Sequence, residues 1–589
     1  MPRETRSRRR LTRKSFASRM QQVLNRTTKL LMRGALTRAL EILSVAVVQH
    51  PDNPAIVTRH ADALYQSGRI TEARDAYRRA CALDKMEFQA WYGCGCAELS
   101  CGAYGRAIHC FRRASALHPE DMDTHRYLGR ALFELGEVDA ALAQFFAVTR
   151  SKNPDERRSA LRSIAIIIPG SSTRGNAAIL KSRCDWATVE EAVEGPPRVP
   201  GVRRRKHGEK LRIGYVSAFF NSRNWMKPVW GVINGHDRAA FEIHLFLDSG
   251  NPDAENGYRR HPHDRIYLTD GLSNEKLAER IAAARIDVLV DVNGYSAANR
   301  LSVFMRKPAP VVLAWFAMYA TTGMRAFDYI VGDASVVPPG EERFYTERVL
   351  RVSGSYIASS PLYDVPRVEE PPCLRTGQIT FGCLAPQYKI TDEVIASWSR
   401  ILKGAQNARL FLKTSCMDEA SNREALYSRF ARHGVTQEQL EVEGPAEYYE
   451  FLVRYGRVDI ALDTFPYNGG TTTFDSLWQG VPVLTFNGDR WVGRNSLSLL
   501  VAAGLGDWAM PSLEAYVKRG IQLATSPDTP DHLVVLRARL REHLLASPAC
   551  DTTALCRELE RHYFAIARPS REKPCPLQAG AAPSHQVHL

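Results

Sequence analysis

Three consecutive threonines behind a glycine pair are the residues of this 589-residue chain best suited to chemistry. Residues 463–475 read Asp-Thr-Phe-Pro-Tyr-Asn-Gly-Gly-Thr-Thr-Thr-Phe-Asp, and a short helix is expected over residues 476–480, followed by a buried strand over 481–486. The hydroxyls could simply cap that helix. A helix N-terminus also attracts anions through its unpaired N–H groups and its dipole. The run therefore predicts a phosphate-binding site.

The same run, with residues 477–485, resembles the nucleotide-sugar-binding signature of the O-linked N-acetylglucosamine transferase and SPINDLY family. A second stretch, residues 381–391, reads Phe-Gly-Cys-Leu-Ala-Pro-Gln-Tyr-Lys-Ile-Thr and resembles the family segment whose Gln and Lys meet the base and diphosphate of the donor. The resemblance covers about residues 211–567 together with the repeat region described below, and it is most specific in the second half. The donor-binding residues that it implies are Gln387, Lys389, Asn468, Gly469, Gly470, Thr471, Thr472, Thr473 and Asp475.

Glycosyl transfer requires that the leaving diphosphate be neutralised and that the acceptor lose a proton. No convincing Asp-x-Asp metal motif lies in a suitable loop, so Lys389, Thr471, Thr472 and the helix N-terminus are the candidates for stabilising the phosphates. Asp475 is expected to accept hydrogen bonds from the ribose hydroxyls, or else to favour the first helical turn. We expect no metal and no cofactor, only a nucleotide-sugar co-substrate that is UDP-linked by resemblance.

The first half departs from the family where the sugar and the acceptor should bind. The family pattern Ser-x-Asp-Phe-x-x-His has Phe219 and Arg223 in place of its acid and histidine, and Asn-Gly-His ends here in Tyr295. An arginine cannot be a general base at neutral pH, and a tyrosine is a poor one. The catalytic candidates are Lys389, Asp291, Tyr295 and Arg223. Three alternatives remain for the last three. In the first, Asp291 takes or relays the acceptor proton, although it could instead be a strand-end acid that binds backbone N–H groups. In the second, Arg223 and Tyr295 recognise a different sugar, for example an acidic one. In the third, this half of the protein has lost catalysis.

Glycines at a constant spacing of 34 residues mark an internal repeat: Gly34, Gly68, Gly102 and Gly136. Each is followed five residues later by an alanine. This period is typical of tetratricopeptide helix–turn–helix units. About four units over residues 20–154 predict a solenoid with a concave groove. The groove is expected to bind an acceptor protein; a role in scaffolding or homo-oligomerisation is the alternative.

From residue 211 the pattern changes to strands alternating with helices. Hydrophobic runs at 211–216, 242–247 and 286–291 are separated by helical stretches, and a second such unit begins near residue 378. This alternation predicts parallel sheets covered by helices. The predicted fold class is therefore α plus α/β, a tetratricopeptide solenoid followed by two Rossmann-like halves of GT-B type with a cleft between them.

Seven segments follow from these changes in pattern. They are a basic arm without assigned structure (1–19), the solenoid (20–190), a linker (191–210), a Rossmann-like half on the acceptor and sugar side (211–375), a nucleotide-sugar half (376–530), C-terminal helices (531–567) and a Pro- and Ala-rich tail (568–589).

Charge and composition bear on the binding partners of the protein, its cellular compartment and whether it crosses a membrane. The chain has a net charge of +14, and half of it lies in the first 19 residues, which hold eight basic residues and one acidic residue. Phe16 is the single aromatic residue among them and makes no stacking surface by itself, so no specific nucleic-acid partner is expected. Twelve scattered cysteines without paired metal spacing fit a reduced cytoplasm. No apolar stretch of about 18 residues is present, which predicts no transmembrane segment.

These features together predict a cytoplasmic, metal-independent protein O-glycosyltransferase. By resemblance it transfers N-acetylglucosamine from UDP-GlcNAc to Ser or Thr of a protein bound by the repeats. One alternative is the transfer of a different or acidic sugar to surface proteins such as flagellin, by analogy alone. The other is a catalytically degenerate adaptor protein, which the altered first half would favour.

Overall fold

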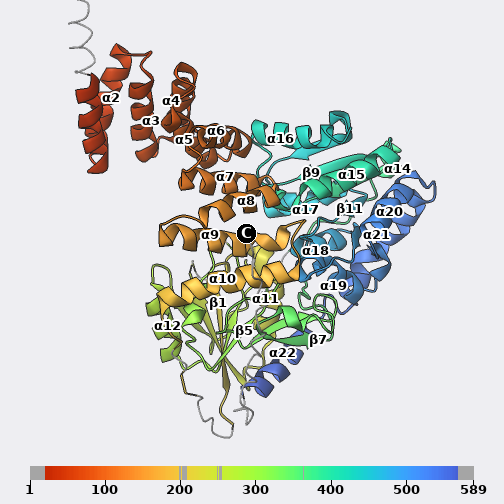
Figure 1. The fold of residues 1–589 in the computed structure, drawn as a ribbon. Helices are drawn as coiled ribbons and strands as arrows, with labels where there is room; N and C mark the ends of the chain where they lie inside the picture. The colour runs from red at the N-terminus through yellow and green to blue at the C-terminus, as the bar shows by residue number, and fades with distance from the viewer. Residues whose placement is uncertain are drawn as a thin grey trace, which may run out of the picture.

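The computed structural model describes residues 20–567, apart from 198–199, 202–207, 249, 251, 253–254, 297 and 363. The chain forms a row of paired helices that leads into two lobes, each built on a sheet (Figure 1). The predicted basic arm, the tail and much of the predicted linker lie outside the described residues. Every helix within the described part is too short or too polar to cross a lipid bilayer.

The solenoid consists of antiparallel helices stacked side by side. Its four repeat glycines all lie in turns between helices with φ of 72° to 82°, a left-handed conformation that glycine adopts without a Cβ clash. The predicted tetratricopeptide architecture is therefore confirmed. After helical residues 20–32, the helices are α2 (Leu36–Gln49), α3 (Pro54–Gln66), α4 (Ile70–Leu83), α5 (Phe88–Ser100), α6 (Tyr104–Leu117), α7 (Met122–Glu134), α8 (Val138–Val148), α9 (Pro154–Ile167), η1 (Ile168–Gly170) and α10 (Asn176–Glu194).

The first lobe is a parallel seven-stranded sheet in the order β3-β2-β1-β4-β5-β6-β7. Central strands such as β4 are buried along their whole length, as parallel strands covered on both faces must be. The strand order reverses between β1 and β4, where ligands of such sheets bind. The elements are β1 (Leu211–Ser217), α11 (Arg223–Gly235), β2 (Phe241–Leu247), β3 (Arg265–Leu268), α12 (Asn274–Ala283), β4 (Val288–Asp291), α13 (Leu301–Met305), β5 (Val311–Ala314), β6 (Tyr329–Asp333), η2 (Glu342–Phe344) and β7 (Arg348–Val352).

The second lobe is a parallel six-stranded sheet in the order β10-β9-β8-β11-β12-β13. Its order reverses between β8 and β11, and the loops after these two strands carry the two sequence motifs. The elements are α14 (Cys373–Thr376), β8 (Thr380–Cys383), η3 (Gln387–Lys389), α15 (Asp392–Gly404), β9 (Arg409–Lys413), α16 (Ala420–Ala431), η4 (Gln437–Gln439), β10 (Leu440–Glu443), α17 (Tyr448–Val453), η5 (Arg454–Arg457), β11 (Ile460–Leu462), α18 (Thr471–Trp478), β12 (Val483–Phe486), η6 (Trp491–Gly493), α19 (Asn495–Ala502), η7 (Gly506–Trp508), β13 (Ala509–Met510) and α20 (Leu513–Thr525).

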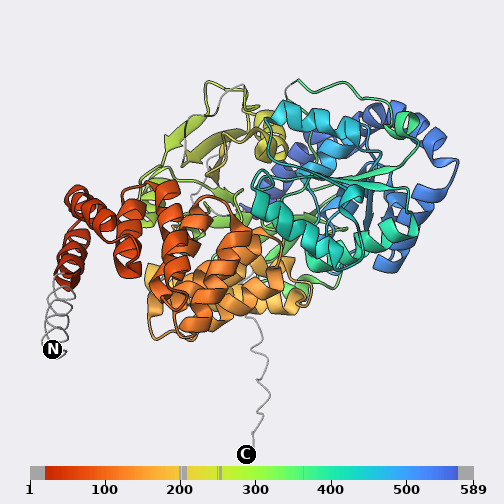
Figure 2. The ribbon, with the colours of Figure 1, turned by 90° about the horizontal axis from the view of Figure 1, so that it is seen from above.

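Two C-terminal helices tie the lobes together. Helix α21 (Thr529–Leu545) packs on α18 of the second lobe, whereas α22 (Thr552–Ile566) returns to the first lobe and packs on α11. The last repeats of the solenoid lie along both lobes and do not project away from them (Figure 2). The predicted fold class, a solenoid followed by two parallel α/β halves, is confirmed.

Candidate active site

The predicted phosphate motif forms the loop between β11 and α18. Helix α18 begins at Thr471, so all three threonines lie in its first turn. The sequence placed the helix start at residue 476, five residues too late. Gly470 is the N-cap and no side chain caps the helix. The N–H groups of the first turn therefore remain available to a ligand.

Glycine is required at position 469 by its close neighbours. A Cβ atom there would lie 2.3 Å from Oγ1 of Thr473. The N–H of Gly469 donates to Oδ1 of Asp463 at 2.9 Å, and Oγ1 of Thr473 lies 2.8 Å from Oγ of Ser496. These bonds hold the loop in place below the start of the helix.

Lys389 lies in η3 and reaches the same loop. Its Nζ donates to the carbonyl oxygen of Asn468 at 2.8 Å and lies 4.3 Å from the centroid of the Tyr467 ring. No carboxylate of the described residues lies within 4.0 Å of this nitrogen. Burial lowers the pKa of Lys389 to about 8, although the nearby charge of Asp463 opposes the shift. A buried ammonium with unused donors and no ion-pair partner is the charge that an anionic ligand would neutralise.

Three buried oxygen atoms around this site have no hydrogen-bond donor among the described residues. They are Oε1 of Gln387, Oδ1 of Asn468 and Oδ2 of Asp475. Nearly all buried polar atoms of native proteins are hydrogen-bonded, so such exceptions call for an explanation. Ribose hydroxyls and the N–H of a base are donors of the kind that could satisfy them.

Asp475 contacts a residue that the sequence analysis missed. Lys227, on α11 of the first lobe, is buried and forms an ion pair with Oδ1 of Asp475 across the two lobes. The hydroxyl of Tyr448 donates to the same oxygen at 2.8 Å. Burial lowers the pKa of Lys227. No local signal marks this lysine, because its partner is 248 positions away along the chain.

Asp291 ends β4, as the sequence predicted, and the structure places it at the reversal point of the first sheet. Its carboxylate accepts backbone N–H groups from Asn293 at 3.2 Å and from Gly294 at 2.9 Å. Burial raises the pKa of Asp291 to about 7, and the two N–H donors partly offset that rise. These contacts match the strand-end alternative, in which the acid stabilises the turn after β4.

Tyr295 is likewise already hydrogen-bonded within the protein. Its hydroxyl donates to the carbonyl oxygen of Thr322 at 2.6 Å, and the guanidinium carbon of Arg183 lies 4.0 Å from the centre of its ring. Burial raises the pKa of Tyr295 well above its usual value, so the phenol stays protonated. Arg223 is the first residue of α11, and its side chain lies outside the described part of the chain.

A cavity of about 560 Å³ joins the solenoid to both lobes. Tyr388 and Tyr467 are in its wall and are the chain neighbours of Lys389 and Asn468, so it lies directly beside the phosphate loop. Tyr295 lines this cavity and Asp291 does not. The aromatic residues of the wall are Tyr127, Phe133, Phe145, Phe219, Trp225, Tyr295, Tyr319, Tyr388 and Tyr467, and the charged ones are Arg126, Arg130, Glu134 and Arg183.

The turn between α7 and α8 of the solenoid packs directly on η3. The carbonyl oxygen of Leu135 accepts a hydrogen bond from Nε2 of Gln387 at 3.4 Å, and the Phe133 ring stacks on Tyr388 with centroids 5.0 Å apart. A Cβ atom on Gly136 would lie 2.3 Å from the carbonyl oxygen of Ile390. The repeat region and the loop with Lys389 are therefore in close backbone contact.

Comparison with known families agrees with this arrangement. The family model described as glycosyl transferase family 41 matches residues 196–360 and 373–559, more than half of the chain. The chain belongs to glycosyl transferase family 41. Two tetratricopeptide repeat models match residues 61–97 and 95–156 of this family 41 protein.

Solved and curated relatives extend the comparison. The structure of a mutant of the Thermobaculum terrenum O-GlcNAc transferase is similar, with a TM-score of 0.72 and 30% identity over 87% of this chain and 98% of that one. The probable UDP-N-acetylglucosamine–peptide N-acetylglucosaminyltransferase SPINDLY of Solanum lycopersicum is 30% identical over 368 residues, 61% of this chain and 39% of that protein. SEC of Arabidopsis thaliana, similarly named, is 29% identical over 373 residues, with coverages of 62% and 38%. The chain thus spans about two-fifths of the length of these curated relatives.

Two non-glycine residues in the cavity wall of this family 41 chain adopt positive φ angles. Ala317 has φ of 65° and Tyr319 has φ of 57°. The Cβ of Ala317 costs on the order of 1 kcal/mol in this conformation. Backbone strain of this kind clusters at ligand-binding sites. The loop from 317 to 319 is therefore a strained part of the site.

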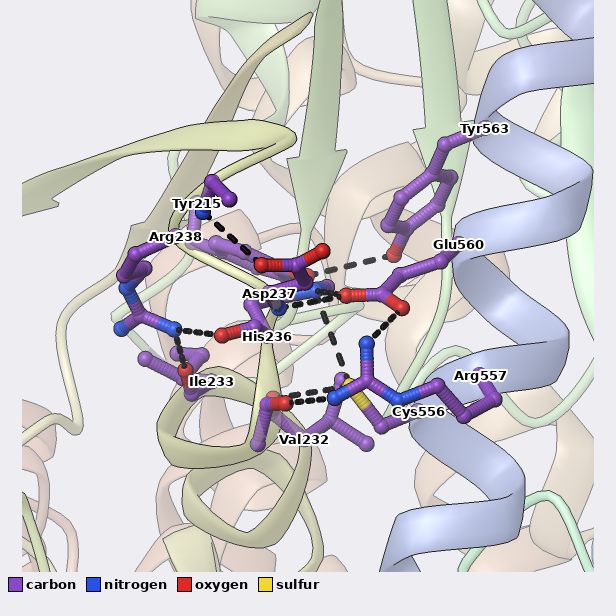
Figure 3. Close-up of polar contacts among 12 residues, drawn as sticks. Tyr215, Val232, Ile233, His236, Asp237, Arg238, Cys556, Arg557, Glu560 and Tyr563 are labelled. Carbon is purple, nitrogen blue, oxygen red and sulfur yellow. Dashed lines mark hydrogen bonds and ion pairs between the residues drawn. The ribbon is translucent and has the colours of Figure 1, made fainter. Parts of the chain in front are cut away.

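One cluster of described residues brings three potential metal-ligand atoms within 4.8 Å of one another: His236, Cys556 and Glu560 (Figure 3). The histidine already bonds the hydroxyl of Tyr215 at 2.7 Å and Glu560 at 3.0 Å. Glu560 also pairs with the Arg557 guanidinium, whose positive charge opposes a bound cation. The cluster does not line the cavity, and we assign it the role of fixing α22 to the first lobe.

Burial of Asp291 is expected to make the stability of this protein depend on pH. Its pKa is about 7 in the folded chain and about 3.9 in the unfolded chain. Between these values the native state holds a proton that the unfolded state has released, so the free energy of unfolding falls as pH rises. The fall attributable to Asp291 is at most about 4 kcal/mol, at about 1.36 kcal/mol per unit.

Urea unfolding at pH 5, 6, 7 and 8 measures this dependence. Burial also raises the pKa of Asp333, Glu347 and Asp463, which contribute with the same sign. Asp291→Asn, which cannot ionise, should therefore show a shallower decline than the wild type. An unchanged slope in this variant would show that Asp291 is already ionised at low pH.

Proposed function

We propose that this family 41 protein transfers a sugar from a nucleotide-diphosphate donor to a Ser or Thr hydroxyl of another protein. The observation that carries the proposal is Lys389, a buried ammonium without a carboxylate partner among the described residues, beside the open N-terminus of α18. A diphosphate would neutralise the ammonium and bind the free N–H groups at once. The names of the relatives support UDP-N-acetylglucosamine as the donor.

The donor residues have separable roles in this proposal. Lys389, with the N–H groups and hydroxyls of Thr471 and Thr472, stabilises the negative charge that grows on the leaving diphosphate. Gln387 offers its free Oε1 to the base, and Asp475 offers its free Oδ2 to the ribose. We propose a metal-independent, GT-B-type reaction, because the lysine and the helix supply positive charge where the leaving group departs.

The acceptor proton requires a base, and neither Asp291 nor Tyr295 is free to serve. Glu134, at the end of α7, is the carboxylate among the described residues that line the cavity, and burial raises its pKa. Its charge also contributes to raising the pKa of Tyr388. We propose that the acceptor oxygen attacks the anomeric carbon, that the bond to the phosphate oxygen breaks, and that the acceptor proton passes to Glu134.

Glu134→Gln tests this assignment. We expect kcat to fall by about 100-fold or more, because general base catalysis contributes roughly that factor. The affinity for UDP should stay within twofold, because among the described residues no hydrogen bond or ion pair joins Glu134 to Lys389 or to residues 463–475. Glu120→Gln, at an exposed position of the solenoid, is the matched control. Equal loss of donor affinity and kcat in Glu134→Gln would instead indicate a structural role.

The experiment that tests the function is a donor panel with the purified protein. UDP-, GDP- and CMP-sugars are compared for binding, for nucleotide release and for transfer to Ser- and Thr-containing peptides. Release and transfer from one donor class would support the proposal and name its sugar, including the acidic sugar that Arg126 and Arg130 would suit. Absence of binding by every donor would overturn the proposal in favour of the adaptor alternative.

We also propose a reducing compartment such as the cytoplasm. The support is that the eleven described cysteines are all free thiols.

A further inference from the structure

A second cavity, of about 790 Å³, lies between the solenoid and the second lobe. Helices α4, α5 and α6 form one wall and α16 forms the other. Cys81, Cys94 and Cys110 are buried in its floor, which is small and weakly polar. None of its lining residues also lines the cavity beside Lys389. We call this space the α6–α16 groove.

The walls of the α6–α16 groove carry an excess of positive charge. Two of its cations already have carboxylate partners, because Arg78 pairs with Glu98 at 2.6 Å and Arg106 faces Glu419 at 3.7 Å.

Two exposed cations remain, Lys85 and Arg113, with no carboxylate of the described residues within 4.0 Å. The guanidinium of Arg113 lies 5.8 Å from the centre of the Trp91 ring, which holds it at the edge of the groove. On the opposite wall Glu424 is the one lining carboxylate from α16. A negatively charged occupant would therefore gain two ion pairs without breaking an existing one.

We propose that the α6–α16 groove docks an acidic, extended segment of a partner protein. Charge complementarity favours carboxylates beside Lys85 and Arg113, and the thiol-lined floor suits a small apolar side chain between them. The terminal segments of this chain do not fit, because residues 1–19 carry eight basic and one acidic residue, and residues 568–589 carry three and one.

A single-stranded nucleic acid is the other flexible polyanion, and it binds through successive aromatic stacking platforms. The groove offers one large aromatic side chain, Trp91. We therefore favour the peptide, and the test includes the nucleic acid as a competing outcome.

Fluorescence anisotropy of the full-length protein tests this docking site without any sugar donor. The probe is a fluorescein-labelled ten-residue peptide of alternating Glu and Ala, and its Gln-Ala counterpart is the neutral comparison. The double variant Lys85→Glu/Arg113→Glu reverses the two free cations. Arg33→Glu/Arg38→Glu makes the same charge change at exposed positions outside the groove.

We expect the groove variant to weaken binding of the acidic peptide at least tenfold and the control variant to change it less than twofold. Glu424→Gln should tighten binding, because it removes a carboxylate that faces the peptide. Equal losses in both double variants would mean unspecific attraction to a basic protein and would overturn the proposal. So would tighter binding of a labelled oligothymidine that depends on the same two residues. Because no donor is present, these results do not depend on the glycosyltransferase assignment.

Discussion

Replacing Lys389 with methionine is expected to lower kcat/KM for sugar transfer by about 100- to 1,000-fold, the usual effect of losing one preorganised donor at a developing anion. Methionine keeps the unbranched shape of the side chain but removes the ammonium that lies 2.8 Å from the carbonyl oxygen of Asn468. Affinity for UDP should fall as well, because the diphosphate contacts the ammonium in the free and the reacting donor alike. Steady-state transfer and calorimetric titration with UDP measure the two effects.

The control for this variant is Lys403→Met on the exposed face of α15, which should behave like the wild type. The wild type offers an independent check through pH. Since the pKa of Lys389 is about 8 in the unliganded protein, affinity for UDP should decline as pH rises above that value, and Lys389→Met should lack this decline. A methionine variant with wild-type affinity and turnover would contradict the donor assignment.

Replacing Lys227 with methionine is expected to destabilise the folded protein by about 3–5 kcal/mol, because it leaves the Asp475 carboxylate buried without its counter-charge. The ion pair joins α11 to α18, so the loss should appear in the unfolding of both lobes. Urea unfolding followed by tryptophan fluorescence measures it.

The double variant Lys227→Met/Asp475→Leu distinguishes the loss of the whole ion pair from the loss of one of its two charges. It removes both charges and should recover most of the lost stability, as replacing a whole buried ion pair commonly does. Losses that simply add would show that the two side chains do not interact. Lys181→Met, which breaks an exposed pair with Asp185, should cost less than about 1 kcal/mol.

Elements whose cues are local could be predicted from the sequence. The four repeat glycines predicted the solenoid, because each turn between its helices requires a residue with a left-handed backbone conformation. Strand β1, predicted over residues 211–216, begins at the predicted residue and ends one residue later, at Ser217. Strands β3, β5, β6, β7 and β13 were not predicted. For β3 and β13 the reason is that two to four partly buried residues leave too little pattern.

The candidate site was predictable only in its donor half. Gln387, Lys389 and the threonine run are each contiguous motifs, and the structure brings them together around the Asn468 loop. The start of α18 was placed too late because the glycine pair and the threonines are weak helix formers. Lys227 and Glu134 could not be found by any local rule, because burial against a different domain gives each its significance.

The contact between the α7–α8 turn and η3 limits where this protein can be shortened or lengthened. The carbonyl oxygen of Leu135 accepts a hydrogen bond from the Gln387 side chain. One repeat earlier, the carbonyl oxygen of Gly102 accepts a hydrogen bond from the Asn422 side chain at 2.8 Å. The catalytic unit therefore begins inside the repeat array and not after it. Changes in repeat number before α5 are expected to leave these two contacts in place, whereas a chain that starts at residue 211 would lack both of them.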